Sequence, residues 1–504
     1  TLRKQNGGNE LSRQEKQQDN VPQKISSSLL DNLVYLRKQF DGSMDFIIRQ
    51  FNIEGTKAAL ITIDNLIDKQ TIAESILNPI RRAKLSHLNG TEKMKEIRDN
   101  ILTTVDQEQM VEFDSLLTKL MSGFAMLAID GCDFMISIGV QSFAYRSISE
   151  PSNEVVQRGS RESFVEPYVI NISMIRRRMK TPKLKFERMQ IQSESKTDVC
   201  LCYLRDKVSP QILKQLKNNI SKIKLETVMA SGYIAPFIER RGLFNGVGVS
   251  ERPDTVCGKI SEGRIAIIVD GTPNVLIVPH LFIENFQTFD DYATRPFFAT
   301  FTRWLKVFAF FLSIFLPGFY VACGTFHPEF LPQVLLTKVV QAQAETPFSL
   351  MIECIMIHII YEILREAGLR VPKPLGHAVS IVGGLVIGEA AVQSGLVGPP
   401  TLMVIALTAI SSYVVPSLYE QTAILRLIFI IIGGTLGFWG ITLGFCAILI
   451  SLCSESIYKI PFSAPLSPFH LRSMRDVAIR ASWKLLRKDV EKIQDMPGSN
   501  VKKK

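Results

Sequence analysis

Long apolar segments are confined to the second half of this chain. The residues before Trp304 resemble those of a soluble protein, whereas the stretch from Trp304 to Leu452 is a series of apolar runs. Runs of this kind are typical of helices that enter or span a bilayer. Because no apolar run precedes them, we expect no secretory signal. The front half should therefore stay in the cytoplasm while the back half is embedded.

Composition agrees with a protein that is half soluble and half embedded. The chain has 504 residues, enough for two or three domains, a mean hydropathy of +0.15 and a formal net charge of +10. Basic residues gather in the C-terminal tail. Beside membrane spans such a tail is expected to face anionic lipid headgroups and not nucleic acid. These basic residues are Arg472, Arg475, Arg480, Lys484, Arg487 and Lys488.

The sequence assembles no site for catalysis, for a metal or for a cofactor. The eight cysteines are scattered without zinc spacing, and Cys200 and Cys202 lie on one strand face, where they cannot readily bond to each other. A cytoplasmic location favours free thiols. No Ser/His/Asp set and no nucleotide-binding loop is present, so we expect a protein that is not an enzyme.

The front half contains an internal repeat. The run Gly123–Gly131 matches Gly263–Gly271 in spacing, and each contains an apolar stretch that enters an Asp-Gly turn, which is typical of a β-hairpin. Upstream, the strand-like run 57–63 resembles 197–203, and each is followed by a helix-like stretch. Four elements in the same order predict two similar α/β subdomains.

These patterns predict an α/β cytosolic domain of two similar subdomains followed by an α-helical multi-pass membrane domain. The expected segments are a disordered tail at 1–29, subdomain 1 at 30–150, a linker with subdomain 2 at 151–300, the membrane domain at 301–455 and a basic cytosolic tail at 456–504.

A charged loop lies between the two copies of the repeat. The sequence Arg158-Gly159-Ser160-Arg161-Glu162 could cradle a phosphate or a carboxylate, but it lacks the Gly-x4-Gly-Lys pattern of a nucleotide loop. The favoured interpretation is a turn held by Arg–Glu pairing. We expect Arg158, Arg161 and Glu162 to form ion pairs between subdomains or subunits, with partners such as Glu251 and Arg252.

The same loop carries a family resemblance. The stretch Arg158–Glu166 resembles the Arg-Gly-Pro-Arg-Glu-x-Phe-x-Glu signature of the GerA family, the A subunits of spore germinant receptors. One departure is Ser160, where that family usually has Pro, so the turn should be looser. Further similar motifs are Ser250-Glu251-Arg252-Pro253-Asp254, Asp270-Gly271-Thr272-Pro273, His327-Pro328-Glu329, Arg365-Glu366-Ala367 and Arg370 two residues before Pro372.

The resemblance implies a subunit of a receptor complex in the inner membrane of spores. It implies partner B subunits that resemble transporters, C subunits that resemble lipoproteins, and a homo-oligomer of A subunits that forms an ion channel. The nutrient would bind to a partner. The resemblance also assigns structural or interface roles to Asp270, Glu366 and Arg370.

Five apolar segments suggest the topology of the back half. They are 305–325, 347–364, 376–397, 402–418 and 424–452. A cytoplasmic front domain and a basic tail on the same side require an even number of crossings, so we expect four crossings with 347–364 embedded but not crossing. Alternatively, 424–452 breaks near Gly433-Gly434 and makes two passes. Within 347–364, His358 and Glu362 could bind a metal or, as the simpler alternative, share a hydrogen bond.

The segment 376–397 combines two helical stripes. Small residues, among them Gly388 and Ala391, form a side that allows close packing. Val382, Val386, Glu389 and Gln393 recur on another side, with an apolar end and an acidic end, as in a hydrophobic constriction beside a charged vestibule. We predict that this second stripe lines a pore. In the alternative, it packs against a neighbour and Glu389 pairs with Arg426 or Arg365.

Two functions follow from these patterns. The first is a ligand-gated channel subunit, favoured by the acidic stripe. The second is a non-conducting scaffold that relays a signal, favoured by the large soluble domain. A conductance measurement separates the two.

Overall fold

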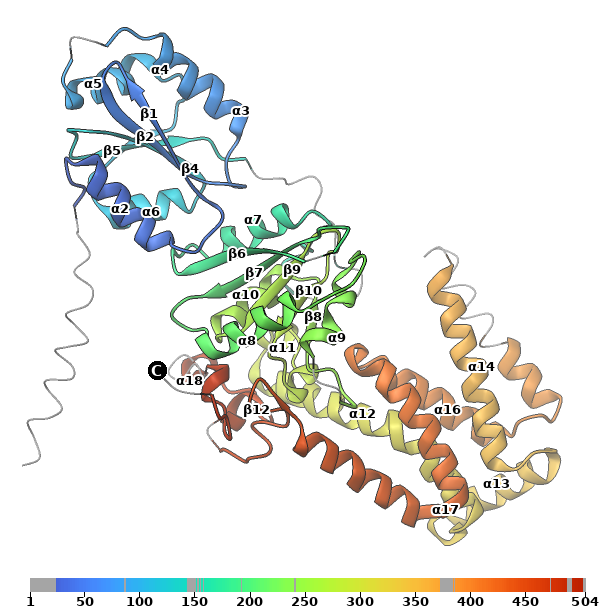
Figure 1. The fold of residues 1–504 in the computed structure, drawn as a ribbon. Helices are drawn as coiled ribbons and strands as arrows, with labels where there is room; N and C mark the ends of the chain where they lie inside the picture. Colours follow the sequence, from blue (N-terminus) through green and yellow to red (C-terminus); the bar gives the residue numbers. More distant parts are fainter. Residues whose placement is uncertain are drawn as a thin grey trace, which may run out of the picture. The chain divides into compact units, whose positions relative to one another are not determined.

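The computed structural model describes residues 24–85, 88–142, 151, 154, 156, 158–191, 193–239, 242–371, 384, 386–471, 473–486 and 492–501. The chain divides into two compact units. The first contains residues 1–155, 160–237 and 249–278, and the second contains 156–159, 238–248 and 279–504. We call them the α/β unit and the helical unit (Figure 1).

The α/β unit begins with a five-stranded sheet in the order β1-β2-β4-β5-β3. Alternate residues of β2 and β4 pack on opposite faces: Ala59 and Ile61 belong to one apolar core, and Ala58 and Leu60 to the other. Burial of both faces explains why these strands read as continuous apolar runs. The strands are β1 (Phe46–Ile53), β2 (Thr56–Ile63), β3 (Gln107–Met110), β4 (Phe124–Ile129) and β5 (Met135–Gly139). One face is covered by α2 (Leu29–Phe40) and α6 (Phe113–Leu120), and the other by α3 (Lys69–Ile72), η1 (Ala73–Leu77), α4 (Asn78–Arg82), α5 (Gly90–Glu96) and η2 (Ile97–Ile101) (Figure 1).

The second sheet repeats this arrangement. Its order β6-β7-β9-β10-β8 is the order of the first sheet with each strand replaced by its counterpart. The predicted repeat of two similar α/β subdomains is therefore confirmed. The strands are β6 (Leu184–Gln190), β7 (Asp198–Leu204), β8 (Gly248–Ser250), β9 (Ile265–Val269) and β10 (Val275–Val278), and the accompanying helices are α7 (Tyr168–Arg178), α8 (Pro210–Ser221), η3 (Ser231–Tyr233), α9 (Ala235–Ile238) and α10 (Pro253–Ser261).

The two Asp-Gly turns occupy equivalent places in the repeat. Gly131 and Gly271 have φ of 85° and 86°, a left-handed conformation that favours glycine. The side chain of Asp130 accepts a hydrogen bond from Leu29 N (3.0 Å), at the start of α2. Asp270 accepts one from Tyr168 N (3.2 Å), at the start of α7. Each aspartate thus caps the first helix of its own subdomain, a role that satisfies otherwise unpaired helix N–H groups.

The helical unit is built around α12 and α17. The two helices approach closely at glycines: a Cβ added at Gly318 would lie within 3 Å of the Phe429 carbonyl, and one at Gly433 would meet the Gly318 carbonyl. The helices of the unit include α11 (Asp290–Ala293), α12 (Pro296–Thr325), α13 (Gln333–Glu345), α14 (Leu350–Arg370), α16 (Pro399–Ser412) and α17 (Tyr419–Ser454), with the short turns η4 (Phe282–Phe286), η5 (Pro328–Phe330) and η6 (Pro416–Leu418). Residues 386–393 between α14 and α16 are also helical.

Within α17 the chain reverses at Gly437, which has non-helical angles of φ 61° and ψ −148°. As a result the ring of Phe315 in α12 contacts Phe429 from the first half of α17 (4.6 Å between ring centres) and Phe445 from the second half (5.6 Å). The expected break in 424–452 is therefore present, but it lies at Gly437 and not at Gly433-Gly434, because Gly433 is used for the approach to α12. That the two halves make two passes stays a prediction.

By length and composition two helices are long and apolar enough to cross a membrane, namely Pro296–Thr325 and Pro416–Ser454, the second of which contains the break at Gly437. The helices α13 and α14 would make a third if this pair, bent by 79°, forms one span. The described helices therefore provide fewer candidate spans than the four crossings expected from the sequence. The reason is local: residues 376–383 and 385 of the segment expected at 376–397 lie outside the described residues, and the segment expected at 402–418 forms a helix of 14 residues, which is short for a span.

The unit boundaries differ from the predicted domains. Residues 279–300 belong to the helical unit and not to subdomain 2. The segment after 455 also belongs there and is partly buried: Phe462 packs on Phe282, with ring centres 6.0 Å apart. This segment contains β11 (Ser456–Ile457), β12 (Ile460–Pro461), η7 (Ser473–Asp476), α18 (Trp483–Leu486) and η8 (Ile493–Asp495).

The C-terminal segment is therefore more than a basic tail on lipid. Arg480 is only 1% exposed and lies over the rings of Tyr292 and Trp483 (5.7 and 5.0 Å). Its expected contact with lipid headgroups is wrong, because aromatic side chains cover the guanidinium. Lys484 is exposed, while Arg472, Arg487 and Lys488 lie outside the described residues.

Candidate functional site

The helix at residues 386–393 exposes the stripe that the sequence places in a pore. Val386 is 56% exposed, and Glu389 and Gln393 are exposed as well. Gln393 Nε2 donates a hydrogen bond to Glu389 Oε1 (3.0 Å), so the two polar side chains lie on one side. Val382 lies outside the described residues. Among the side chains that the structure describes, Glu389 forms no ion pair with Arg365 or Arg426.

The small residues of this helix face the rest of the unit. Ala391 is buried in the apolar cluster that includes Val404 and Ile405. A Cβ added at Gly388 would meet Leu402 Cδ2 at 3.4 Å. One side of the helix is therefore packed within the unit, and the side with Glu389 is left for water or for another chain.

Glu353 is a buried carboxylate with a complete set of donors. It is 1% exposed, and Oε1 accepts from Thr346 Oγ1 (2.5 Å) while Oε2 accepts from Gly398 N (3.2 Å) and Thr401 Oγ1 (3.0 Å). Gly398 is the N-cap of α16, so the carboxylate also lies at the positive end of a helix. This residue joins α14 to α16, and it forms no ion pair with the described side chains.

His358 and Glu362 do not share the hydrogen bond expected of them. Their Nδ1 and Oε1 atoms are 4.0 Å apart, which is too far. Both carboxylate oxygens of Glu362 instead lie 2.8 Å from the hydroxyl of Tyr419, and Arg365 stacks over that same ring at 3.4 Å. No group of three or more metal-ligating side chains occurs in the described part of the chain.

Arg426 is buried completely between α17 and α12. Its side chain is 0% exposed, and Nε donates to the carbonyl of Ser313 (2.8 Å). That carbonyl is free because Pro317, four residues later, has no N–H to donate to it. The terminal nitrogens Nη1 and Nη2 have no hydrogen-bond partner among the described residues. The sequence pattern suggests Arg426 only as a possible partner of Glu389.

In the α/β unit the charged loop is held by partners other than those predicted. Glu162 pairs with Arg177 (2.5 Å) and Arg178 of α7, and not with Arg252. These hydrogen bonds and the two positive charges lower the pKa of Glu162 against the opposing effect of burial. The correction has a simple cause: α7 follows the loop and brings its last turn back against it.

Arg252 still binds the loop, but through the main chain. Its Nη2 donates to the carbonyl of Ser160 (3.0 Å), and its ion pair is with Asp254 (2.5 Å). Ser250 Oγ donates to Glu154 (2.7 Å), whose pKa is raised chiefly by burial. The carbonyl of Glu251 accepts from Phe164 N (2.8 Å). The motif around Glu251 thus anchors the loop, while the ion pairs predicted for Arg161 remain a prediction.

Three other predicted residues have local roles. Arg158 donates from its main-chain N–H to Asp290 (3.4 Å). Glu366 and Arg370 form an exposed pair one turn apart on α14 (2.6 Å), which is worth little in stability.

The ion pair that joins the two subdomains is not predictable from the sequence pattern. Arg176 of α7 bonds to Asp45, which precedes β1, through Nε to Oδ2 (2.8 Å) and Nη2 to Oδ1 (2.9 Å). Nearby, Lys185 donates to the carbonyl of Gln39 (2.7 Å). The run Arg176–Arg178 was the available signal, but nothing in it distinguishes the buried arginine from its neighbours.

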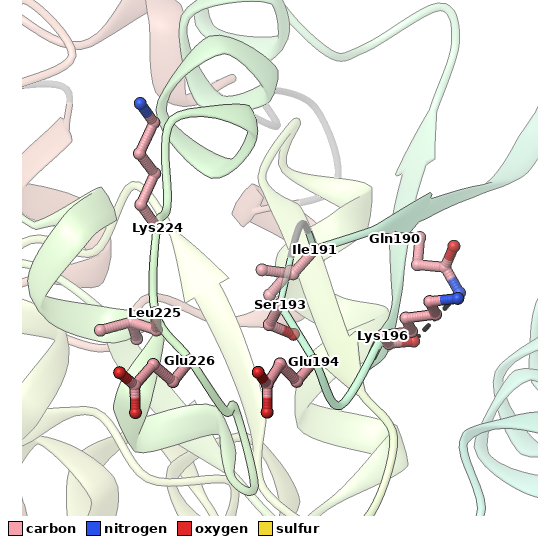
Figure 2. A pocket seen from close by; sticks show the side chains of 8 residues that line it. All are labelled: Gln190, Ile191, Ser193, Glu194, Lys196, Lys224, Leu225 and Glu226. Carbon is pink, nitrogen blue, oxygen red and sulfur yellow. Dashed lines mark hydrogen bonds between the residues drawn. The ribbon is translucent and has the colours of Figure 1, made fainter.

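A broad surface hollow lies in the second subdomain and has a volume of about 630 Å³. It is lined by the β6–β7 connection and by residues 224–226. Figure 2 shows Glu194 and Glu226 side by side, while Lys224 and Lys196 point away from them. Because its charged groups do not converge on one point, this open hollow has no arrangement that would grip a particular ligand.

Comparisons with known proteins agree with these features. Over residues 34–491 the chain matches the family described as Bacillus/Clostridium GerA spore germination protein. It is 38% identical to spore germination protein KA of Bacillus subtilis (strain 168), over 93% of this chain and 87% of that protein. It is 34% identical to the uncharacterized membrane protein YfkQ of the same organism, over 92% and 91%.

A solved structure is also similar. The crystal structure of the N-terminal domain of the A subunit of the Bacillus megaterium spore germinant receptor GerK3 shares 30% identity with this chain, covers 51% of it and 97% of that domain, and gives a TM-score of 0.42. The family match, which extends over both the two-sheet unit and the helical unit, gives the assignment: this chain belongs to the GerA family of spore germination proteins.

Proposed function

We propose that this chain is the A subunit of a nutrient germinant receptor in the spore inner membrane. It would work with transporter-like B subunits and lipoprotein-like C subunits, and its α/β unit would face the cytoplasm. Support comes from the similarity to spore germination protein KA over nearly the full length of both chains and from the apolar helices of the helical unit.

Within that receptor, several copies of the chain would form a ring that conducts cations. The observation that carries this proposal is the exposed stripe of Val386, Glu389 and Gln393 on a helix whose other side packs inside an apolar bundle. A carboxylate on the outside of such a bundle is costly in contact with lipid. Facing an axis shared by several copies, Glu389 would instead meet water and attract cations, and Val386 would form an apolar gate.

The test is ion flux. The full-length chain is reconstituted in liposomes, and cation flux is compared with that of empty liposomes and of a Glu389→Gln preparation with the same oligomeric state. In parallel, potassium release is recorded from spores that carry the complete receptor at matched levels. A conducting ring predicts flux that depends on residue 389.

The second candidate is a non-conducting scaffold whose α/β unit relays the germinant signal. The buried pair between Arg176 and Asp45 favours it, because the pair makes two subdomains respond as one body. Two results together would support the scaffold and exclude the pore. The correctly assembled protein would conduct no ions in liposomes, and substitutions at residues 386 and 389 would leave ion release from spores unchanged.

A further inference from the structure

We propose that Arg426 anchors a binding site for a small monovalent anion inside the helical unit. The guanidinium is 0% exposed, and neither Nη1 nor Nη2 has a hydrogen-bond partner among the described residues. Buried charged groups normally have a counter-charge and a full set of hydrogen bonds. Glu353 in the same unit shows the usual situation, because each of its oxygens is satisfied.

The guanidinium of Arg426 is fixed in place at its inner end. Nε donates to the carbonyl of Ser313, which Pro317 leaves without its helical partner. The side chain therefore cannot swing away without leaving a buried carbonyl unpaired. The two terminal nitrogens are held on the side of the guanidinium away from this anchor, where an acceptor can meet both of them.

Among the described residues, no acidic side chain forms an ion pair or hydrogen bond with the terminal nitrogens of Arg426. Glu362 is in electrostatic range of Arg426, but its oxygens are engaged by the Tyr419 hydroxyl, and Arg365 stacks on that same ring. With two arginines and one glutamate, this cluster carries one excess positive charge. The sequence from Ala367 to Gly388 contains no Asp or Glu, so the undescribed stretch at 372–383 holds no hidden counter-charge.

The donors define the class of ligand. A guanidinium only donates hydrogen bonds, and both terminal nitrogens of Arg426 lack a partner among the described residues. The occupant must therefore be an acceptor, and the single excess charge selects a monovalent anion. Chloride and a small carboxylate share this chemistry, and the planar fork of arginine suits a carboxylate in particular. This inference does not depend on whether the chain conducts ions.

The experiment is a chloride titration of the purified full-length chain in detergent, at constant ionic strength with sodium isethionate as the bulky reference salt. Binding is followed by the ³⁵Cl NMR line width and by the midpoint of thermal unfolding. We expect saturable line broadening and a rise of about 2–5 °C at saturation, because a ligand that binds only the folded state stabilises it. Acetate that displaces chloride would identify a site for carboxylates as well, and acetate that does not would define a chloride site.

The variants locate the site. Arg426→Met should weaken chloride binding at least tenfold, whereas Arg370→Met, which removes an exposed arginine of α14, should leave it unchanged. If Arg426→Met fails to fold, Pro317→Ala serves instead. The alanine has an N–H that can bond the Ser313 carbonyl and so release Nε of Arg426. This variant should weaken chloride binding although the guanidinium of Arg426 is still present. Wild-type protein without a saturable chloride effect, or a folded Arg426→Met protein that binds chloride as tightly as wild type, would overturn the proposal.

Discussion

Arg176 and Asp45 form a two-point ion pair in which both side chains are fully buried, with Nε–Oδ2 and Nη2–Oδ1 distances of 2.8 and 2.9 Å. Ser43 Oγ accepts from Nη2 (3.0 Å), and the carbonyls of Thr181 and Leu184 accept from Nη1 (3.2 Å each). Every donor of the guanidinium is thus used. Since Asp45 belongs to the first subdomain and Arg176 to the second, this pair fixes one subdomain on the other.

Removal of either partner should destabilise the α/β unit. We expect Arg176→Met or Asp45→Asn to lower its free energy of unfolding by about 3–5 kcal/mol, because a buried charge or its donors are left uncompensated. Pulse proteolysis in urea of the full-length chain measures this. The control is Arg188→Met, which breaks an exposed pair with Asp198 and should cost at most about 1 kcal/mol. Equal losses in the two variants would contradict the assigned role.

Lys185 should make the stability of the same unit depend on pH. Burial, with repulsion from Arg205 and Arg176, lowers its pKa from 10.5 to about 8. Between these values the folded state binds fewer protons than the unfolded state, so the contribution of Lys185 to stability increases as pH rises from 8 to 10.5. Below pH 8 the charged form costs about 3 kcal/mol. From pH 7.5 to pH 10 the urea midpoint of unfolding should rise less in Lys185→Met than in wild type. An equal rise in the two proteins would refute the lowered pKa of Lys185.

The close approach of α12 and α17 should not tolerate a methyl group. We expect Gly318→Ala and Gly433→Ala to separate the helices and to reduce the yield of monodisperse protein several-fold, because the added Cβ would lie within 3 Å of a backbone carbonyl. Size-exclusion chromatography of the detergent-purified chain measures this yield. Gly384→Ala is the matched control, since a Cβ added there would meet no described atom within 4 Å. A normal yield for both core variants would show that the contact is not needed.

Val386→Ala should open the proposed gate. A smaller side chain at an apolar constriction widens it and lets water enter, so we expect ion leak and germination without nutrient. The measurement is potassium release from dormant spores with receptor levels matched to wild type. The control is Val404→Ala, which removes the same atoms at a buried position of α16 and so shows the effect of a loss of packing alone. If spores with Val386→Ala stay dormant, Val386 is not part of the gate.

Glu389→Gln should reduce the preference for cations while the fold is kept. The substitution keeps the volume and removes the charge, and Glu389 is exposed, so we expect less than about 0.5 kcal/mol of change in stability. Reversal potentials in reconstituted bilayers report the selectivity. An exposed acid outside the stripe, Glu366→Gln, should leave selectivity as it is. The same shift in both variants would indicate a general surface-charge effect.

Much of the α/β unit could be predicted from the sequence because its signals are local. The Asp-Gly turns at 130 and 270 need a glycine in a left-handed conformation, and strands buried on both faces read as unbroken apolar runs. Repetition of these signals in the same order predicted two similar subdomains, and the two sheets have the same strand order.

The position of the chain reversal in α17 needed the tertiary structure. Several glycines in 424–452 have no distinguishing local signal, yet Gly433 lies against Gly318 and only Gly437 has non-helical angles. A glycine permits both a turn and a close helix contact. Which of these it makes depends on the helix that packs beside it.

The sequence by itself determined the order of elements, the two Asp-Gly hairpins and the separation into a two-sheet half and an apolar helical half, because turn chemistry and hydrophobic period act between neighbours along the chain. The tertiary structure alone decided which charges are buried. Arg176 finds Asp45 across 131 residues, and Arg426 finds the Ser313 carbonyl across 113. Neighbouring arginines are chemically equal, and only packing removes one of them from water and gives it a partner.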